Sequence, residues 1–424
     1  MVDGKLVALK SINSQTALKS LAFMMFAMFA MTTDSVGTVI PEIIKEFRLG
    51  LTAAGSFQYA SMSGIGISAI ALGFLADRIG RKITILAGLL LFGASSALFA
   101  AGHSLGLFTT LLFFAGLGIG IFKAGALALI GDISNSTRQH TTNMNLLEGF
   151  FGVGAIIGPA IVAWLVQSGL SWKWIYLIAA ILCAMLIVLT AATRFPQPQL
   201  LDQARSVPGE AVRMARQPAA LFFGLALMLY VGGEAAVYVW APTYLSGGSG
   251  DLAWLALYAV SAFFMLRAVG RFLGAWLLGR YDWSTVLIVC TTAVALLFWV
   301  AVIGGPQAGI VALPATGIFM SVLYPTINST GISCFEKSKH GAISGLLLFF
   351  TCLSAVLAPL GMAALGDGLG DTRYSIALGA SMTTVLALLC FWNWARKPFA
   401  ALLFERNAAD YAGSGTDRAL ADMA

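Results

Sequence analysis

Long apolar runs, separated by short polar segments, follow one another along nearly the whole chain. A helix that crosses a bilayer needs about 20 consecutive, mostly apolar residues. When the sequence is cut at charged residues, prolines and glycine clusters, twelve runs of that length remain. They cover residues 18–40, 51–76, 83–101, 106–131, 142–167, 173–194, 219–245, 252–279, 285–304, 308–332, 341–366 and 374–396. The pattern predicts an all-α integral membrane protein with twelve transmembrane helices.

The longest polar stretch between these runs divides them into two sets of six. We therefore expect an N-terminal six-helix bundle over residues 1–194, a cytoplasmic linker over 195–218, a C-terminal six-helix bundle over 219–397 and a cytoplasmic tail over 398–424.

Composition supports a membrane protein and excludes several functions. Hydrophobic residues make up 59% of the chain and charged residues 10%, whereas about 25% of an average soluble domain is charged. The five cysteines are scattered without a CxxC pair, and there are three histidines. This composition predicts no enzyme, no metal centre, no cofactor and no disulfide framework. No phosphate-binding lysine motif is present either, so ATP hydrolysis by this chain is not expected.

The distribution of basic residues predicts the orientation, because cytoplasmic loops retain Lys and Arg. With both termini in the cytoplasm, Lys45, Arg48, Lys173 and Arg373 fall outside and Lys123 falls within a span. The other basic residues, with Arg267 and Arg271 counted among them, fall on the cytoplasmic side. The net charge of +6 is therefore read as a signal of topology in a bacterial inner membrane, and nucleic-acid binding is not expected.

The two halves repeat one another at an offset of about 200 residues, as the halves of many transporters do. Gly73 at the end of the second span corresponds to Gly274 at the end of the eighth, and Pro159 corresponds to Pro359. At the same offset, Asp34 in the first span corresponds to Glu234 in the seventh. We expect two pseudo-symmetric bundles that carry matched acids.

The segment after the second span resembles the loop signature of the major facilitator superfamily. The residues that carry the resemblance are Gly73, Asp77, Arg78, Gly80, Arg81 and Lys82. The resemblance implies the two-bundle fold of that superfamily and a conformational gate at these six residues. Glycines allow close helix approach, an aspartate can lie at a neighbouring helix N-terminus, and the basic residues hold the turn at the headgroups.

Three shorter windows, 147–155, 230–236 and 319–329, resemble the fucose/glucose:proton symporter branch of that superfamily. This narrower resemblance implies proton-coupled uptake of a hexose or a related sugar. The chain departs from that branch at two positions. Lys123 stands where the branch usually carries a glutamate, and Asp34 lies about one turn before the usual aspartate of the first span.

Four ionisable residues lie well inside the predicted spans: Asp34, Lys123, Glu148 and Glu234. Each costs roughly 2.5–3.5 kcal/mol at a helix centre, so we expect them to act in proton coupling. Lys123 and Glu148 lie at similar depth and could form a pair.

Asp34 and Glu234 then remain without an obvious basic partner. Because a carboxyl group in a low-dielectric cavity readily holds a proton, Asp34 is expected to take up and release the coupling proton. Glu234 shares that role or binds sugar hydroxyls.

A sugar ring has apolar faces and a polar edge, so its site needs aromatic, amide and hydroxyl groups. The candidates for this site are Gln58, Tyr59, Asn145, Tyr238, Trp240, Tyr324 and Asn328.

The leading hypothesis is a secondary active transporter, a symporter that takes up a sugar with protons by alternating access and works as a monomer. Two alternatives stay open. A proton-driven efflux antiporter is one, because residues 154–159 partly match the kinked-helix motif of drug exporters. An organic-anion uptake transporter is the other, because Lys123 could meet a carboxylate if Glu148 does not pair with it.

Overall fold

The computed structural model of the chain describes residues 2–71, 75–99, 102–134, 137–195, 213–248, 253–336 and 339–411. Nearly all of this part is helical, and it contains no β-strand. The helices of the first half are α1 (Val2–Thr33), α2 (Val36–Phe47), α3 (Leu51–Ala54), α4 (Ser56–Ala71), α5 (Leu75–Arg78), α6 (Arg81–Phe99), α7 (Leu105–Asp132), α8 (Thr137–Gln167) and α9 (Trp174–Ala192). Those of the second half are α11 (Pro218–Ala235), η1 (Ala236–Trp240), α12 (Ala241–Leu245), η2 (Ala253–Tyr258), α13 (Ala259–Leu278), α14 (Trp283–Ser333), α15 (His340–Leu369), α16 (Arg373–Arg396) and α17 (Ala400–Tyr411).

The predicted twelve crossings are confirmed. Over the described residues, ten helices are long and apolar enough to cross a membrane. One of them, α14, contains two crossings, because Gly305 has a φ of 71° and interrupts the helical backbone there. Glycine tolerates this left-handed conformation, and Pro306 then suits the first turn of a new helix. The remaining crossing is built from the shorter helices α3, α4 and α5.

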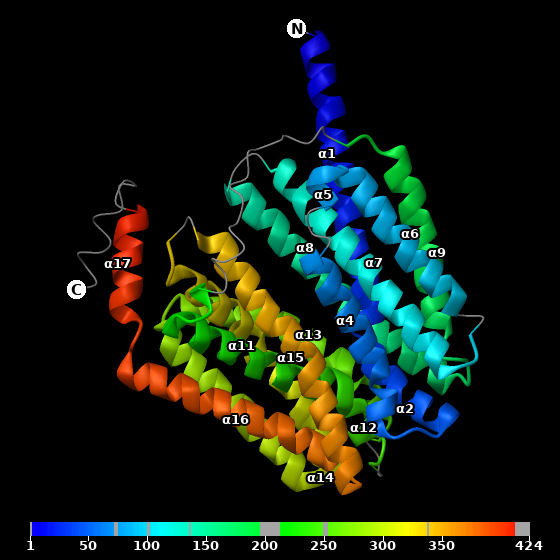
Figure 1. Cartoon of the computed structure of the whole chain (residues 1–424), viewed down its shortest axis with the longest axis vertical. Helices are drawn as coiled ribbons and strands as arrows, with labels where there is room; N and C mark the ends of the chain where they lie inside the picture. Colours follow the sequence, from blue (N-terminus) through cyan, green and yellow to red (C-terminus); the bar gives the residue numbers. More distant parts are fainter. Residues whose placement is uncertain are drawn as a thin grey trace.

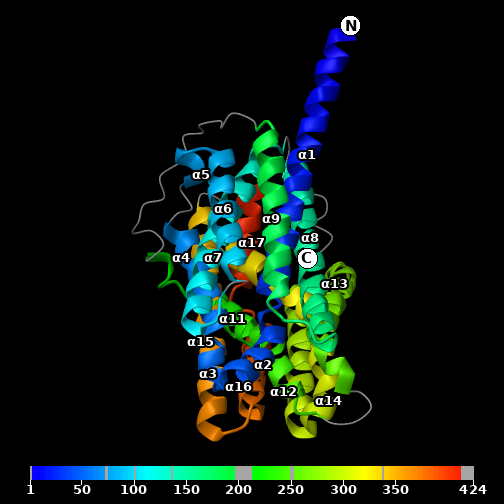
Figure 2. The same cartoon turned by 90° about the vertical axis from the view of Figure 1, so that its right-hand side faces the viewer.

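The helices form two bundles, as predicted (Figures 1 and 2). Within the first bundle α1 packs on α8, and α7 packs on both α4 and α6. Within the second, α13 packs on α14, α14 on α16 and α11 on α15. The bundles meet where α4 contacts α15, α8 contacts α13 and α2 contacts α12. The linker predicted over 195–218 lies mostly outside the described residues, and the predicted C-terminal tail includes α17.

The residues of the superfamily signature fix the turn before α6. Gly80 has a φ of 87°. The Arg81 guanidinium pairs with Asp132 at 2.9 Å, and Lys82 Nζ donates to the carbonyl oxygens of Ala191 and Thr193 at 2.7 and 2.9 Å. The start of α6 is thus tied to the ends of α7 and α9. Arg78 lies exposed in α5. Gly73 and the side chain of Asp77 lie outside the described residues, so the role of this segment as a gate stays a prediction.

Close contact between α4 and α7 depends on small residues. A Cβ atom at Gly64 would collide with the Phe113 carbonyl oxygen, and one at Gly116 would collide with the Ser61 carbonyl oxygen. In membranes, helix association relies on this kind of close backbone packing, because lipid is as apolar as a leucine side chain. Gly106, in the first turn of α7, has open space at its Cβ position.

We expect Gly116→Ala to destabilise the protein by about 1–3 kcal/mol, as overpacking does, because the new methyl group forces α4 and α7 apart. Gly106→Ala, on the same helix, is the matched control and should not lower stability, because its methyl group meets open space. The thermal unfolding midpoint of the detergent-purified protein measures both effects. Equal midpoints for the two variants would show that the α4–α7 contact does not need a glycine.

Candidate functional site

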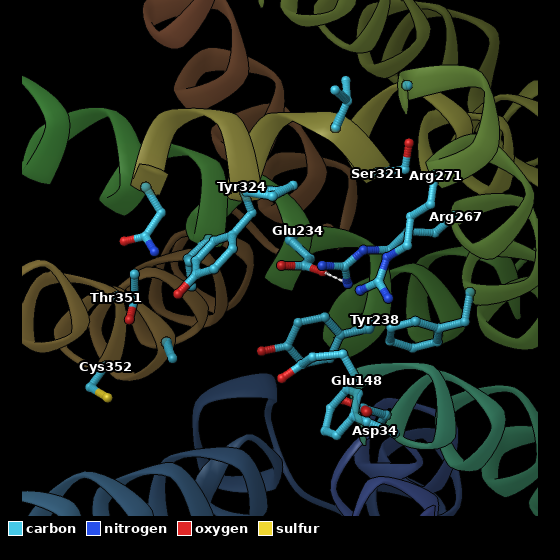
Figure 3. Close-up of a pocket in the computed structure, with 18 of the residues that line it drawn as sticks. Asp34, Glu148, Glu234, Tyr238, Arg267, Arg271, Ser321, Tyr324, Thr351 and Cys352 are labelled. Carbon is cyan, nitrogen blue, oxygen red and sulfur yellow. Dashed lines mark hydrogen bonds and ion pairs between the residues drawn. The ribbon is translucent and has the colours of Figure 1, made fainter. Parts of the chain in front are cut away.

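A cavity of about 760 Å³ lies between the two bundles (Figure 3). We call the end of the molecule that carries Arg81 and Lys82 the inner end, which the sequence predicts to face the cytoplasm, and the end that carries α2 and α12 the outer end. The lining residues of α13 begin at Phe264 and reach Leu278, at the inner end of that helix. The lining residues of α8, α14 and α15 likewise lie in the inner halves of their crossings. The cavity therefore extends from the middle of the molecule toward the inner end.

Contacts between the bundles close the outer side of this cavity. Gln58 is fully buried, and its Nε2 atom donates to Tyr238 Oη at 3.1 Å. The carbonyl oxygen of Pro359 accepts hydrogen bonds from Tyr59 Oη of the first bundle at 3.3 Å and from Trp240 Nε1 of its own bundle at 3.1 Å. These residues form a layer beneath the cavity, which we call the outer seal.

A helix cap completes the closure at the outer surface. The Asp367 carboxylate at the end of α15 accepts hydrogen bonds from the backbone N–H groups of Leu51 and Thr52, at 2.7 and 2.8 Å. These N–H groups begin α3, in the other bundle, so the carboxylate both satisfies free donors and meets the positive end of a helix. Two further bonds between the bundles join Ser261 Oγ to the Ile156 carbonyl at 2.9 Å and Tyr258 Oη to Gln167 Oε1 at 2.9 Å.

Among the described residues, six charged side chains line the cavity. Asp34, Lys123 and Glu148 come from the first bundle, and Glu234, Arg267 and Arg271 come from the second. Figure 3 shows the two arginines side by side on α13, with Glu148 and Asp34 entering from the α8 and α1 side. The sequence-based assignment of Arg267 and Arg271 to the cytoplasmic side is wrong. Both lie within the apolar segment Trp254–Leu278 and face the cavity.

Glu234 forms an ion pair with Arg267 through the Arg267 Nη1 atom. Both side chains are largely buried, with 12% and 18% of their surfaces exposed. The prediction that Glu234 lacks a basic partner is therefore wrong. The signal that could have found Arg267 was present: residues 267 and 271 are one helical turn apart inside a predicted span. The Nε atom of Arg267 donates to no described residue, so this guanidinium retains a free donor.

Asp34 lies in the two-residue break between α1 and α2, at the middle of the membrane segment. It is 7% exposed, and its Oδ2 atom accepts no hydrogen bond from any described residue. Glu234, Arg267 and Lys123 are near enough to act on it electrostatically. A buried carboxyl group without a fixed partner is the kind of group that can exchange a proton.

Lys123 and Glu148 do not pair in this structure. Within the described part of the chain, neither side chain forms an ion pair. The Lys123 ammonium instead lies over the rings of Phe26 and Phe29, at 5.7 and 5.4 Å from their centroids. Such contacts stabilise a cation and leave its hydrogen-bond donors available. The alternative in which Lys123 faces the transported molecule therefore stays open.

The structure separates the predicted sugar-binding residues into two groups. Tyr238, Tyr324 and Asn328 line the cavity. Gln58, Tyr59 and Trp240 instead belong to the outer seal, and the side chain of Asn145 lies outside the described residues. Two hydroxyl groups that the sequence did not single out, those of Ser321 and Thr351, also line the cavity. Tyr324 packs on the buried ring of Tyr230, with a centroid separation of 5.8 Å. Whether these groups bind a sugar stays a prediction.

Two helical bundles that enclose a charged cavity, closed at one end and open toward the other, define the class of the protein as a membrane transporter. Comparison with protein families agrees, because residues 22–359 match the Major Facilitator Superfamily. The chain belongs to this family. The sequence-based assignment to the superfamily is thereby confirmed.

Relatives and solved structures extend the comparison. Protein TsgA of Escherichia coli O9:H4 (strain HS) is 26% identical over 319 residues, which cover 75% of this chain and 80% of that protein. The nucleoside transporter NupG has a TM-score of 0.76 at 15% identity, over 89% of this chain and 98% of its own. The Escherichia coli fucose:proton symporter FucP has a TM-score of 0.60 at 22% identity, over 89% of this chain and 99% of its own. The two structural similarities concern the fold.

The cap formed by Asp367 predicts a conformational effect. Asp367→Ala removes the carboxylate that links α15 to α3, so the outer side opens more often. In a background without the native cysteines, Leu51→Cys keeps the backbone N–H and provides a reporter at a position that is 8% exposed. A membrane-impermeant maleimide added from outside should label this cysteine several times faster in the Asp367→Ala variant.

Asp371→Ala is the matched control for this experiment, because the Asp371 carboxylate accepts from Arg373 N at 2.8 Å within its own bundle. It should leave the labelling rate unchanged. If Asp367→Ala also leaves the rate unchanged, the cap does not hold the outer side closed.

The Glu234–Arg267 pair predicts a non-additive effect on stability. Glu234→Gln or Arg267→Met alone leaves one buried charge without its partner, which costs about 3–5 kcal/mol. The double variant removes both charges and should recover most of that loss. Thermal unfolding of the purified variants measures the coupling. Glu42→Gln is the control, since it breaks the more exposed pair with Lys45, a kind of contact worth about 1 kcal/mol or less. Additive losses in the double variant would contradict a mutually compensating pair.

Proposed function

We propose that the protein is a proton-coupled symporter that takes up a small hydroxylated solute of the sugar class by alternating access. The observation that carries the proposal is the position of Asp34. This acid is nearly inaccessible, has a carboxylate oxygen without a hydrogen-bond donor, and lies beside the cavity at the break between α1 and α2.

The ion pair next to Asp34 supplies a way to link its proton to the conformation of the bundles. Arg267 is bound to Glu234 and still has a free Nε donor. When Asp34 is ionised, it attracts Arg267 across the boundary between the bundles. When Asp34 is protonated, this attraction is lost, and Arg267 stays with Glu234. The protonation state of Asp34 thus changes the interaction between the two bundles, which is the coupling that a symporter needs.

The lining supports a hydroxylated solute. The aromatic rings of Tyr238 and Tyr324 offer flat apolar surfaces, and Asn328, Ser321 and Thr351 offer polar groups to the same cavity. Sugars are bound by this combination, in which a ring face packs on an aromatic side chain and hydroxyls meet polar groups. Proteins of similar fold include a fucose:proton symporter, a D-xylose–proton symporter and a nucleoside transporter, whose named substrates all carry a sugar ring.

The outer seal supports alternating access. The substrate must pass the layer of Gln58, Tyr59, Tyr238 and Trp240 to reach the cavity from outside. In a second conformation the bundles would part at this layer and close at the inner end. We propose that the predicted sugar ligands Gln58, Tyr59 and Trp240 are then uncovered, so that they meet the substrate as it enters.

Asp34→Asn should abolish accumulation of the substrate against its gradient while sparing exchange of internal for external substrate. The asparagine mimics the protonated acid and keeps the size of the side chain, but it carries no proton between the two sides. Proteoliposomes with an imposed pH gradient and a panel of labelled sugars and sugar derivatives measure both activities.

Asp371→Asn is the control and should retain accumulation, because the Asp371 side chain is exposed at the outer surface. If the Asp34→Asn variant still accumulates its substrate, Asp34 is not the coupling group. If the wild-type protein moves none of the panel, the assignment to the sugar class is wrong.

A further inference from the structure

The charges of the cavity divide unequally between the bundles. The first bundle contributes Asp34, Glu148 and Lys123, a sum of one negative charge when all three are ionised, and the second contributes Glu234, Arg267 and Arg271, a sum of one positive charge. For the described lining residues the two sums cancel. The empty cavity with Asp34 ionised is therefore neutral, and protonation of Asp34 leaves one excess positive charge.

An excess charge is costly when a transporter passes through a closed state. During the switch from one side to the other, the cavity is shut off from water, and a net charge held in that low-dielectric space is unfavourable. The cavity that holds the proton alone is therefore disfavoured in the closed state. The loaded cavity becomes neutral again if the transported molecule carries a single negative charge.

Two cationic side chains of the cavity are free to bind a negatively charged group of the transported molecule. Within the described part of the chain, Arg271 and Lys123 form no ion pair or hydrogen bond with an acid. They reach the cavity from different bundles, Arg271 from α13 and Lys123 from α7. Arg271 is exposed, and Figure 3 shows it beside the paired Arg267 with its guanidinium toward the cavity. A bound carboxylate satisfies this guanidinium through two parallel hydrogen bonds.

We infer that the substrate is a monocarboxylate of the sugar class, a hexuronate or a related sugar acid, and that one proton and one such anion cross together without net charge. This inference rests on the proposed function. Arg271 binds the carboxylate with the help of Lys123, while Tyr324 and Asn328 face the hydroxylated ring. Binding of the anion alone or of the proton alone leaves the closed cavity charged, so the two travel together.

The charged and titratable groups around Asp34 are consistent with this charge balance of the cavity. The charged groups that face it or the cavity are Lys123 on α7, Glu148 on α8, Glu234 on α11, and Arg267 and Arg271 on α13. Tyr238 on η1, Tyr324 on α14 and Cys352 on α15 are the other titratable groups of the described lining, and they are neutral when protonated. Protonation of Asp34, the acid that the proposed function uses, moves the cavity from zero to one positive charge.

D-Glucose and D-glucuronate are a matched pair of probes, because they differ at a single carbon. Glucose has a CH₂OH group there, and glucuronate has a carboxylate. Uptake of each labelled compound is measured in proteoliposomes of the full chain with an inward proton gradient. The membrane potential is clamped at zero or set inside-negative with potassium and valinomycin. We expect accumulation of glucuronate at least tenfold over that of glucose, at a rate that the membrane potential does not change.

The outcomes are distinguishable. If glucose accumulates with protons and glucuronate does not, the inference of an anionic substrate is wrong and the proposed function stands. If glucuronate uptake is strongly accelerated by an inside-negative potential, the charge balance is wrong. If neither these two compounds nor any other member of the sugar panel accumulates, the proposed function itself is contradicted, and the inference that rests on it fails as well.

Two variants connect the result to the cavity. Arg271→Gln should raise the glucuronate concentration for half-maximal uptake at least tenfold, and Lys123→Gln should do so even if the first variant folds poorly. Arg280→Gln is the matched control, because Arg280 follows the same helix, lies outside the cavity and stacks on Trp276 at 4.2 Å. An unchanged half-maximal concentration in both cavity variants would overturn the assignment of the carboxylate site.

Discussion

The structure depends on one constraint, the cost of a charged side chain at membrane depth. The ion pair between Glu234 and Arg267 satisfies that constraint inside the second bundle. Arg267 keeps a free Nε donor, and Asp34 keeps an unbonded carboxylate oxygen. These two groups belong to different bundles and are free to interact. In the proposed function, a change in the protonation of Asp34 alters its interaction with these neighbouring charges and so affects how the two bundles are held together.

The contacts between the bundles bear on how the proposed movement would occur. The polar contacts at the outer side are the hydrogen bond from Gln58 to Tyr238, the bond from Tyr59 to the Pro359 carbonyl and the cap by Asp367. Close packing accompanies them, because α2 packs on η1 and α12, and a Cβ atom at Gly37 would collide with the Tyr238 carbonyl oxygen. Inside the first bundle, glycines such as Gly64 and Gly116 likewise let backbones touch. We propose that alternating access exchanges the contacts between the bundles and keeps the packing inside each bundle.

Much of the fold could be predicted from the sequence, because the thickness of the bilayer fixes the length of an apolar run. The twelve crossings and the two bundles follow from that length and from the repeat that relates Asp34 to Glu234. The interruption at Gly305 also falls where the apolar runs predicted a loop. Local sequence patterns carry this part of the information well.

The site was predicted less completely, and for physical reasons. Arg267 and Arg271 were assigned to the cytoplasmic side because a count of basic residues does not distinguish a loop from the inner end of a helix that faces a cavity. Which partner a buried acid finds depends on helix rotation, and the sequence does not specify this. The seal residues Gln58, Tyr59 and Trp240 were grouped with the substrate site because residue types that bind sugars also close interfaces. In this structure they close the interface, and their contact with the substrate remains part of the proposed function.

We propose that the two bundles rock about the charged cavity. Distances between pairs of spin labels, measured by pulsed electron resonance on the purified protein, test this movement. One pair joins residues 53 and 369 at the outer end, and the other joins residues 79 and 281 at the inner end, all of them exposed. When pH is lowered and substrate is added, we expect a population in which the outer pair moves apart while the inner pair approaches. Unchanged distances in both pairs under every condition would contradict it.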